Sequence, residues 1–65
     1  MWYTFWFEIV GEDSDLCGEE FFTELKTADK AEHVKYAQSI FPGEEIKCYG
    51  KVSAAYAEMV GLDTY

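Results

Sequence analysis

Apolar and polar residues alternate along the chain in patterns typical of three strands and two helices. Residues 2–10 are mostly aromatic or β-branched, as strands prefer. One face of this strand carries Tyr3, Phe5, Phe7 and Ile9. The opposite face carries Trp2 and Trp6 and is also largely apolar. Because both faces are apolar, we predict a central strand that is covered on both sides.

Residues 20–27 alternate more regularly and predict a second strand. Its inward side chains are those of Phe21, Thr23 and Leu25. A hairpin register with Phe7 opposite Thr23 and Ile9 opposite Phe21 centres the connecting loop near Asp15. A register shifted by two residues keeps the same faces inward and stays open.

The next segment predicts a helix over residues 28–41, ended by Pro42-Gly43. Thr27 or Asp29 is suited to cap its start, and Asp29 with Glu32 has the spacing of a capping box. Its apolar stripe is formed by Ala31, Val34, Ala37 and Phe41, with Ile40 beside it.

Residues 45–51 predict a third strand with Ile46 and Cys48 facing inward. Ser53 is suited to cap a short second helix over residues 54–60, and Gly61 to end it. A right-handed crossover through the first helix makes strands two and three parallel. The prediction is therefore a single α+β domain over residues 1–65, ββαβα, with a three-stranded sheet in the order 2-1-3.

Charge is concentrated in the first hairpin. The chain has 13 Asp and Glu against 5 Lys, and no Arg. Residues 1–25 hold seven carboxylates and no lysine, whereas residues 26–65 hold six carboxylates and five lysines. This distribution argues against direct binding of DNA or RNA, which needs clustered basic residues. With aromatics at 18% of the chain, disorder is also not expected.

Two surfaces are candidates for binding a protein partner. One is the acidic loop of the hairpin, and the other is the second face of the sheet, which one short helix can cover only in part. A solvated loop and a face covered by the chain itself are the alternatives. The candidate residues are Glu12, Asp13, Asp15, Glu19 and Glu20 on the loop, and Trp2, Trp6, Phe22 and Tyr49 on the face.

The loop also resembles a calcium-binding loop. Asp13, Asp15 and Gly18, with Glu24 at the twelfth place, match most of that pattern. Against it, Cys17 stands where an oxygen ligand belongs, and the flanking segments are strands where the calcium loop has helices. We therefore expect no metal and no other cofactor.

The sequence gives little support to catalysis or export. The single histidine, His33, lies on the first helix, where a packing or solvent-exposed role is commoner than that of a general base. No nucleophile–base pair or phosphate-binding loop is recognisable. The apolar start lacks the features of a signal peptide or a membrane span, so a cytoplasmic location is expected. There Cys17 and Cys48 would be free thiols, although a bridge between them stays open for an exported protein.

Three short stretches resemble a known group of proteins. They are residues 27–32 after a strand, residues 48–50, and residues 57–63 near the end. The chain is similar here to short acidic proteins of unassigned role that are carried on bacterial conjugative elements and phages. The resemblance implies a bacterial cytoplasmic accessory protein and assigns no functional residue.

The sequence thus favours a non-enzymatic, acidic protein-interaction module. Alternatives are a mimic of nucleic-acid charge that inhibits a DNA-binding protein, and a calcium-binding protein that uses the 13–24 loop. No membrane partner is expected. A weak homodimer is compatible with these features, and it should tighten as salt screens the hairpin charge.

Overall fold

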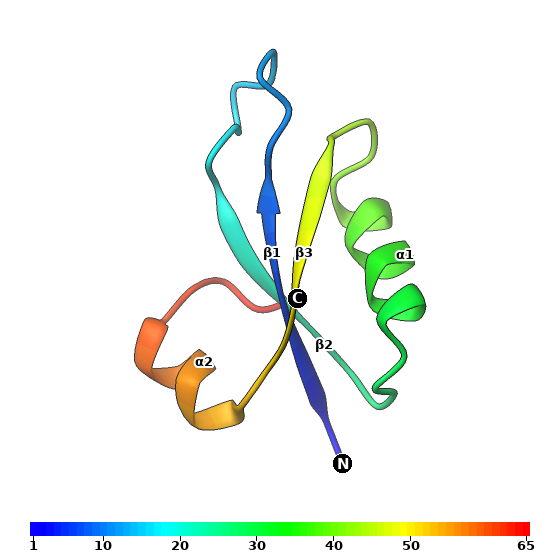
Figure 1. Ribbon diagram of the computed structural model, residues 1–65, viewed down its shortest axis with the longest axis vertical. Coiled ribbons are helices and arrows are strands. Elements are labelled where there is room, and N and C mark those ends of the chain that lie inside the picture. The colour runs from blue at the N-terminus through cyan, green and yellow to red at the C-terminus, as the bar shows by residue number, and fades with distance from the viewer.

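The computed structural model describes all 65 residues and has the predicted α+β architecture. Along the chain lie β1 (Tyr3–Ile9), β2 (Glu20–Leu25), α1 (Lys30–Ile40), β3 (Ile46–Val52) and α2 (Ala54–Val60). The sheet order is β2-β1-β3, and β1 is antiparallel to both neighbours, which makes β2 and β3 parallel to each other. In Figure 1, the β1–β2 loop lies at one end of the sheet and α2 toward the other end.

The hairpin register is shifted by two residues from the one we predicted. Phe7 lies opposite Phe21, and Phe5 lies opposite Thr23. The expected pairing of Phe7 with Thr23 is therefore wrong, although the same side chains face inward. Consecutive turns fold the loop, with Ser14 N–H donating to Gly11 O at 3.1 Å and Cys17 N–H to Ser14 O at 3.1 Å. Gly18, with φ of 94°, allows the chain to turn back into β2.

A bulge in β3 changes the alternation that the sequence predicts. Phe7 pairs with Cys48 but Trp6 pairs with Gly50, so Tyr49 is an extra residue on the β3 side. Gly50 has φ of 119°, a conformation that suits glycine. Cys48 faces α1 and Tyr49 lies on the opposite face beside Trp6, as alternation predicts. The bulge reverses the facing of the residues after it, so Lys51 pairs with Phe5 and Val52 with Thr4.

The hydrophobic core lies between α1 and the sheet. Five residues form its buried cluster: Phe5, Phe7, Ile9, Phe21 and Ala37. Val34, Phe41, Ile46 and Cys48 pack around it. Both strand predictions for Ile46 and Cys48 are confirmed, but Ala31 is exposed and not part of the stripe. The face of α1 that meets the sheet includes His33 instead.

The start of α1 is capped differently from a capping box. Asp29 is the N-cap, and its carboxylate accepts the Ala31 N–H at 3.0 Å. The Asp29 N–H, which a capping box would pair with Glu32, donates to Thr27 Oγ1 at 3.1 Å. Ser53 and Gly61 delimit α2 as predicted: the Ser53 hydroxyl accepts the Tyr56 N–H at 3.1 Å, and Gly61 has φ of 72°.

His33 is a fully buried part of this core. Its ring stacks on Phe5 with centroids 4.1 Å apart. Nδ1 lies 2.8 Å from Thr23 Oγ1, and Nε2 lies 2.7 Å from the Thr27 carbonyl oxygen. Because a carbonyl only accepts, Nε2 carries a proton and donates it. Of the packing and solvent-exposed roles expected for His33, the structure shows packing.

The other sheet face is covered by α2 and by the residues that follow it. Phe22 is completely buried there, although α2 itself contains no buried residue. Residues 63–65 run parallel to β2 along its outer edge. The Phe22 N–H donates to Asp63 O at 2.8 Å, Tyr65 N–H donates to Phe22 O at 2.9 Å, and Glu24 N–H donates to Tyr65 O at 2.9 Å. We call residues 63–65 the C-terminal strap.

The strap also reaches the core side of the sheet. The Tyr65 ring meets Phe21 edge-on at 5.8 Å between centroids, and meets Phe41 edge-on at 5.6 Å. The strap therefore joins β2 to the end of α1 and closes one edge of the sheet. The pairing of residues 63–65 with β2 was not predicted from the sequence.

The His33 contacts lead to a stability prediction. We expect His33→Phe to lower the free energy of unfolding by about 1–3 kcal/mol, because it leaves buried hydrogen-bonding groups unpaired. Thr23→Val should also destabilise the protein. Urea denaturation of the double variant should show a smaller loss than the sum of the two single losses, since the Thr23–His33 pair is then removed as a unit. Additive losses would mean that the pair does not interact.

The strap leads to a prediction for amide hydrogen exchange. The Phe22 and Glu24 amides donate to strap carbonyls, so they should exchange whenever the strap opens. Tyr65→Pro removes the N–H that bonds to Phe22, and it should lower the protection of both amides roughly 2- to 12-fold relative to Tyr65→Ala. Thr64→Pro is the control, because the Thr64 N–H takes no part in the ladder. Equal protection in Tyr65→Pro and Tyr65→Ala would contradict this pairing.

Candidate functional site

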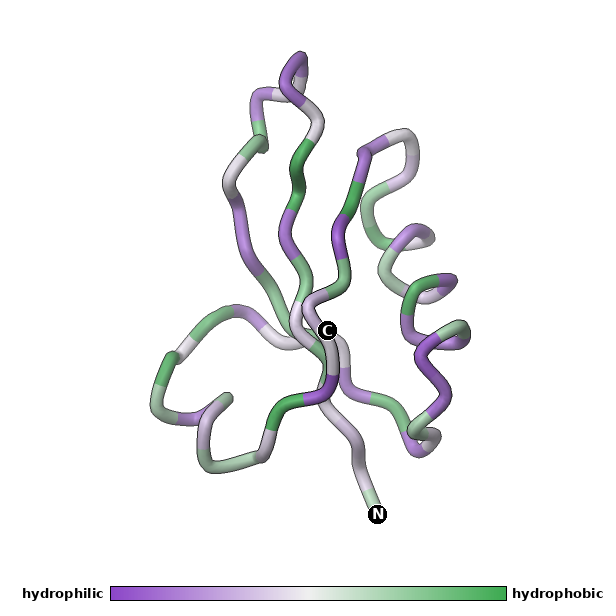
Figure 2. The backbone as a smooth tube through the Cα atoms, in the orientation of Figure 1, coloured by the Kyte–Doolittle hydropathy of each residue, from purple (hydrophilic) through white to green (hydrophobic).

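Eight of the 13 carboxylates lie at one end of the molecule, which we call the acidic end. Six come from the first hairpin and two from the turn between α1 and β3: Glu8, Glu12, Asp13, Asp15, Glu19, Glu20, Glu44 and Glu45. The turn is held there by the Val10 N–H, which donates to Glu45 O at 2.8 Å. Figure 2 shows the concentration of hydrophilic residues at the tip of the hairpin loop.

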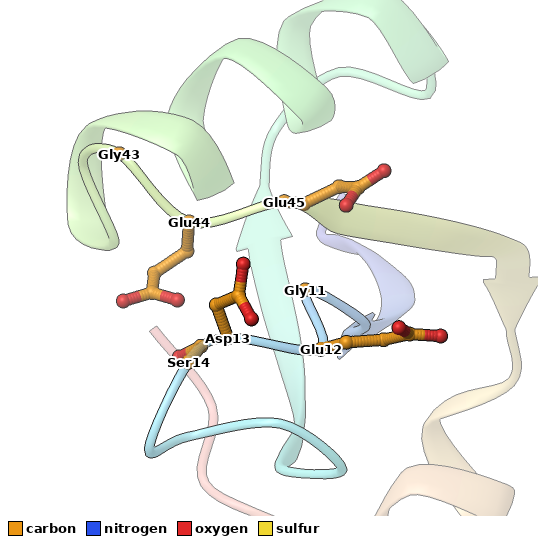
Figure 3. Close-up of a pocket in the computed structure, with 7 residues that line it drawn as sticks. All are labelled: Gly11, Glu12, Asp13, Ser14, Gly43, Glu44 and Glu45. Atoms are coloured by element: carbon orange, nitrogen blue, oxygen red, sulfur yellow. The ribbon is translucent and has the colours of Figure 1, made fainter.

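An open cleft of about 350 Å³ separates the hairpin loop from this turn. Four carboxylates line it, those of Glu12, Asp13, Glu44 and Glu45, with two glycines and Ser14. Figure 3 shows Glu12 and Asp13 on the loop side of the cleft and Glu44 and Glu45 on the turn side. The loop and the turn approach each other closely at Gly11, where an added Cβ would lie 3.5 Å from Glu45 Cβ.

Two further carboxylates lie directly opposite each other in the sheet. Glu8 and Glu20 form the last cross-strand pair of β1 and β2. Side chains at even positions of β1 lie on the face away from α1, so Glu8 and its partner Glu20 both lie there. Like charges in this position destabilise a sheet. On its other side Glu8 pairs with Lys47 of β3.

Aromatic side chains beside this pair hold its carboxylates in place. The Trp6 Nε1–H donates to Glu20 Oε1 at 2.8 Å, and the Tyr49 hydroxyl donates to Glu8 Oε1. The Trp6 and Tyr49 rings stack with centroids 4.5 Å apart and an angle of 29°. Both donors are neutral, so they orient the two negative charges without neutralising them. We call these four residues the acidic–aromatic surface.

The same contacts change the acidity of Tyr49. Its hydroxyl hydrogen bond to the Glu8 carboxylate raises the pKa of Tyr49 above the ordinary 10.0, and desolvation and the charges of Glu8 and Glu20 act in the same direction. The phenol therefore stays protonated and continues to donate to Glu8 at neutral pH.

The structure separates the other aromatic candidates from this surface. Phe22 is fully buried, so its predicted exposure to a partner is wrong: α2 and the strap cover it. Trp2 is 59% exposed, but it lies at the opposite end of β1, beyond the buried Thr4. Lys26 Nζ lies 5.1 Å from the Trp2 ring centroid. Trp6 and Tyr49 are thus the aromatic candidates that meet the acidic residues.

The calcium candidates do not come together. Asp13 and Asp15 lie in the hairpin loop, whereas Glu24 lies in β2 toward the other end, beside the strap. No three side chains of the types His, Cys, Asp and Glu are arranged to hold a metal ion. Cys17 is exposed on the loop, Cys48 packs beside the core, and both are free thiols.

Sequence reasoning missed three residues of this region, Glu8, Glu44 and Glu45. Glu44 and Glu45 join the acidic end because β3 begins beside the end of β1, which the predicted sheet order already implies. Glu8 was assigned to no site because it is a single charge within an apolar strand. Tyr56 lies on α2 with its ring centroid 6.2 Å from that of Trp6, a contact that depends on how α2 folds back.

Comparison with known proteins adds no further assignment. Neither a protein-family model, a curated protein nor a solved structure matches this chain significantly. Neither helix has the length and apolar character needed to cross a membrane.

The Tyr49 contact predicts a specific pH dependence. The folded protein holds the phenolic proton more tightly than the unfolded chain, so this stabilisation is complete below pH 10 and is lost as the pH rises through the raised pKa. The difference between wild-type and Tyr49→Phe absorbance at 295 nm should give a titration midpoint above 10.0. Glu8→Gln should move this midpoint back toward 10.0, and a wild-type midpoint at or below it would contradict the contact.

Proposed function

We propose that this protein is a non-enzymatic interaction module that binds a basic protein partner through its acidic end and the adjoining acidic–aromatic surface. The observation that carries the proposal is the pair of hydrogen bonds from Trp6 to Glu20 and from Tyr49 to Glu8. They join the two candidate surfaces into one continuous surface. Its charge steers a basic partner, and its aromatic rings supply apolar contact area.

The arrangement of charge supports this proposal. Gathering eight carboxylates at one end costs stability through mutual repulsion. Lys47, the cross-strand neighbour of Glu8 on β3, is the lysine that lies among them. In a chain of 65 residues the hydrophobic core offers little surplus stability to offset such repulsion. A basic partner would relieve it on binding.

The remaining chemistry fits a binding role better than catalysis. His33, the only histidine, is fully buried with both ring nitrogens bonded to threonine groups, so it cannot contact a substrate. The free thiols Cys17 and Cys48 suit a reducing compartment such as the cytoplasm, which we propose as its location.

Charge-matched variants test the proposal. Glu8→Gln/Glu20→Gln and Glu32→Gln/Glu58→Gln both change the net charge from −8 to −6, but only the first pair alters the proposed surface. Tagged wild-type protein should capture a basic protein from a bacterial lysate, and the Glu32/Glu58 variant should capture it equally well. The Glu8/Glu20 variant should lose most of this capture, and high salt should weaken capture by the wild type, because it screens the same charges.

The first pair should also fold at least as well as the wild type. Removing the like-charge pair while keeping the amide oxygens as acceptors should raise the free energy of unfolding by about 0.2–1 kcal/mol. A gain in stability together with a loss of binding would distinguish a functional surface from a damaged fold. Equal capture by the two double variants, or capture of acidic proteins only, would refute the proposed function.

A further inference from the structure

The outer face of the Tyr49 ring is open to a ligand. Its inner face stacks on Trp6, and Tyr49 is 43% exposed. From α2, the Tyr56 ring approaches Trp6 on the same sheet face, tilted by 52° against it. No other aromatic ring packs on Tyr49.

One side chain of the protein, the cation Lys47, lies over this outer face. Lys47 Nζ lies 4.9 Å from the Tyr49 ring centroid. A cation–π contact at an exposed site is weak, and Lys47 is exposed with a flexible side chain. Because this contact is weak, a cationic ligand that makes additional contacts can take the place of Lys47.

The carboxylate beside the ring favours one kind of cation. Tyr49 donates to Glu8 Oε1, which fixes the carboxylate at the ring edge and leaves its second oxygen as an acceptor. A guanidinium group is planar, so it can stack on an aromatic ring while its edge N–H groups donate to a carboxylate. An ammonium group is a compact point charge and does not combine these two contacts equally well.

We infer that Tyr49 and Glu8 form an arginine-binding site, in which the guanidinium of a partner's arginine stacks on Tyr49 in place of Lys47 and donates to Glu8. Glu20, opposite Glu8 in the sheet, adds negative charge beside the site. The inference rests on the proposed function, because it names the chemistry of the basic partner. The chain has no arginine, so its own residues cannot fill the site in this way.

The test is an NMR titration of the ¹⁵N-labelled protein, residues 1–65, with two peptides, acetyl-Gly-Gly-Arg-Gly-Gly-amide and its lysine counterpart. The arginine peptide should shift the Tyr49 amide and the Trp6 indole signals, with a Kd at least about twofold below that of the lysine peptide. Tyr49→Leu should weaken arginine binding roughly two- to fivefold. Tyr56→Leu, which removes a tyrosine from the same face, should leave it unchanged.

Removal of the internal competitor gives a second, independent result. Lys47→Ala should strengthen arginine binding roughly two- to fivefold, because no cation then has to leave the ring. Lys35→Ala makes the same change in net charge from an exposed position on α1 and should have little effect.

The unfavourable outcomes are also distinct. Equal affinity for the two peptides, no binding of either, or equal effects of Lys47→Ala and Lys35→Ala would overturn the arginine site. Each of these results leaves the capture experiment with the Glu8/Glu20 variant to decide the proposed function separately.

Discussion

The rest of the structure depends on the need to cover both apolar faces of β1 with two helices of unequal length. The 11-residue α1 covers one face and, with it, forms the buried core around Phe7 and Ile9. The 7-residue α2 covers only part of the other face, where the strap completes the burial of Phe22. Toward the hairpin loop, α2 covers Trp6 only in part, through Tyr56. The Trp6 ring is also held by Tyr49 and Glu20, so the acidic–aromatic surface follows from this shortage of cover.

The sequence predicted those features that depend on local pattern. Strand order, element order and the limits of α2 followed from alternation, capping residues and the apolar character of β1. The hairpin register did not, because a shift of two residues buries the same side chains and only the loop geometry distinguishes the two arrangements. The strap pairing did not either, because residues 63–65 are joined to β2 by backbone groups, which are the same in every residue.

The candidate site was predicted in its parts but not in its arrangement. The acidic loop and the residues Trp6 and Tyr49 were identified from composition and alternation. Their shared face follows from alternation, but their stacking and their hydrogen bonds to Glu20 and Glu8 depend on side-chain positions that alternation does not specify. Likewise His33 was recognised as a packing residue, but its buried partners Thr23 and Thr27 became evident only from the register.

The strap has a consequence for how copies of this sheet can grow edge to edge. The strap pairs with the outer edge of β2, so β3 is the edge that is open to a further strand. Two copies joined along β3 would form a six-stranded sheet that carries a strap on both outer sides. Lys47 and Lys51 on β3, together with the bulge, further discourage even this single pairing.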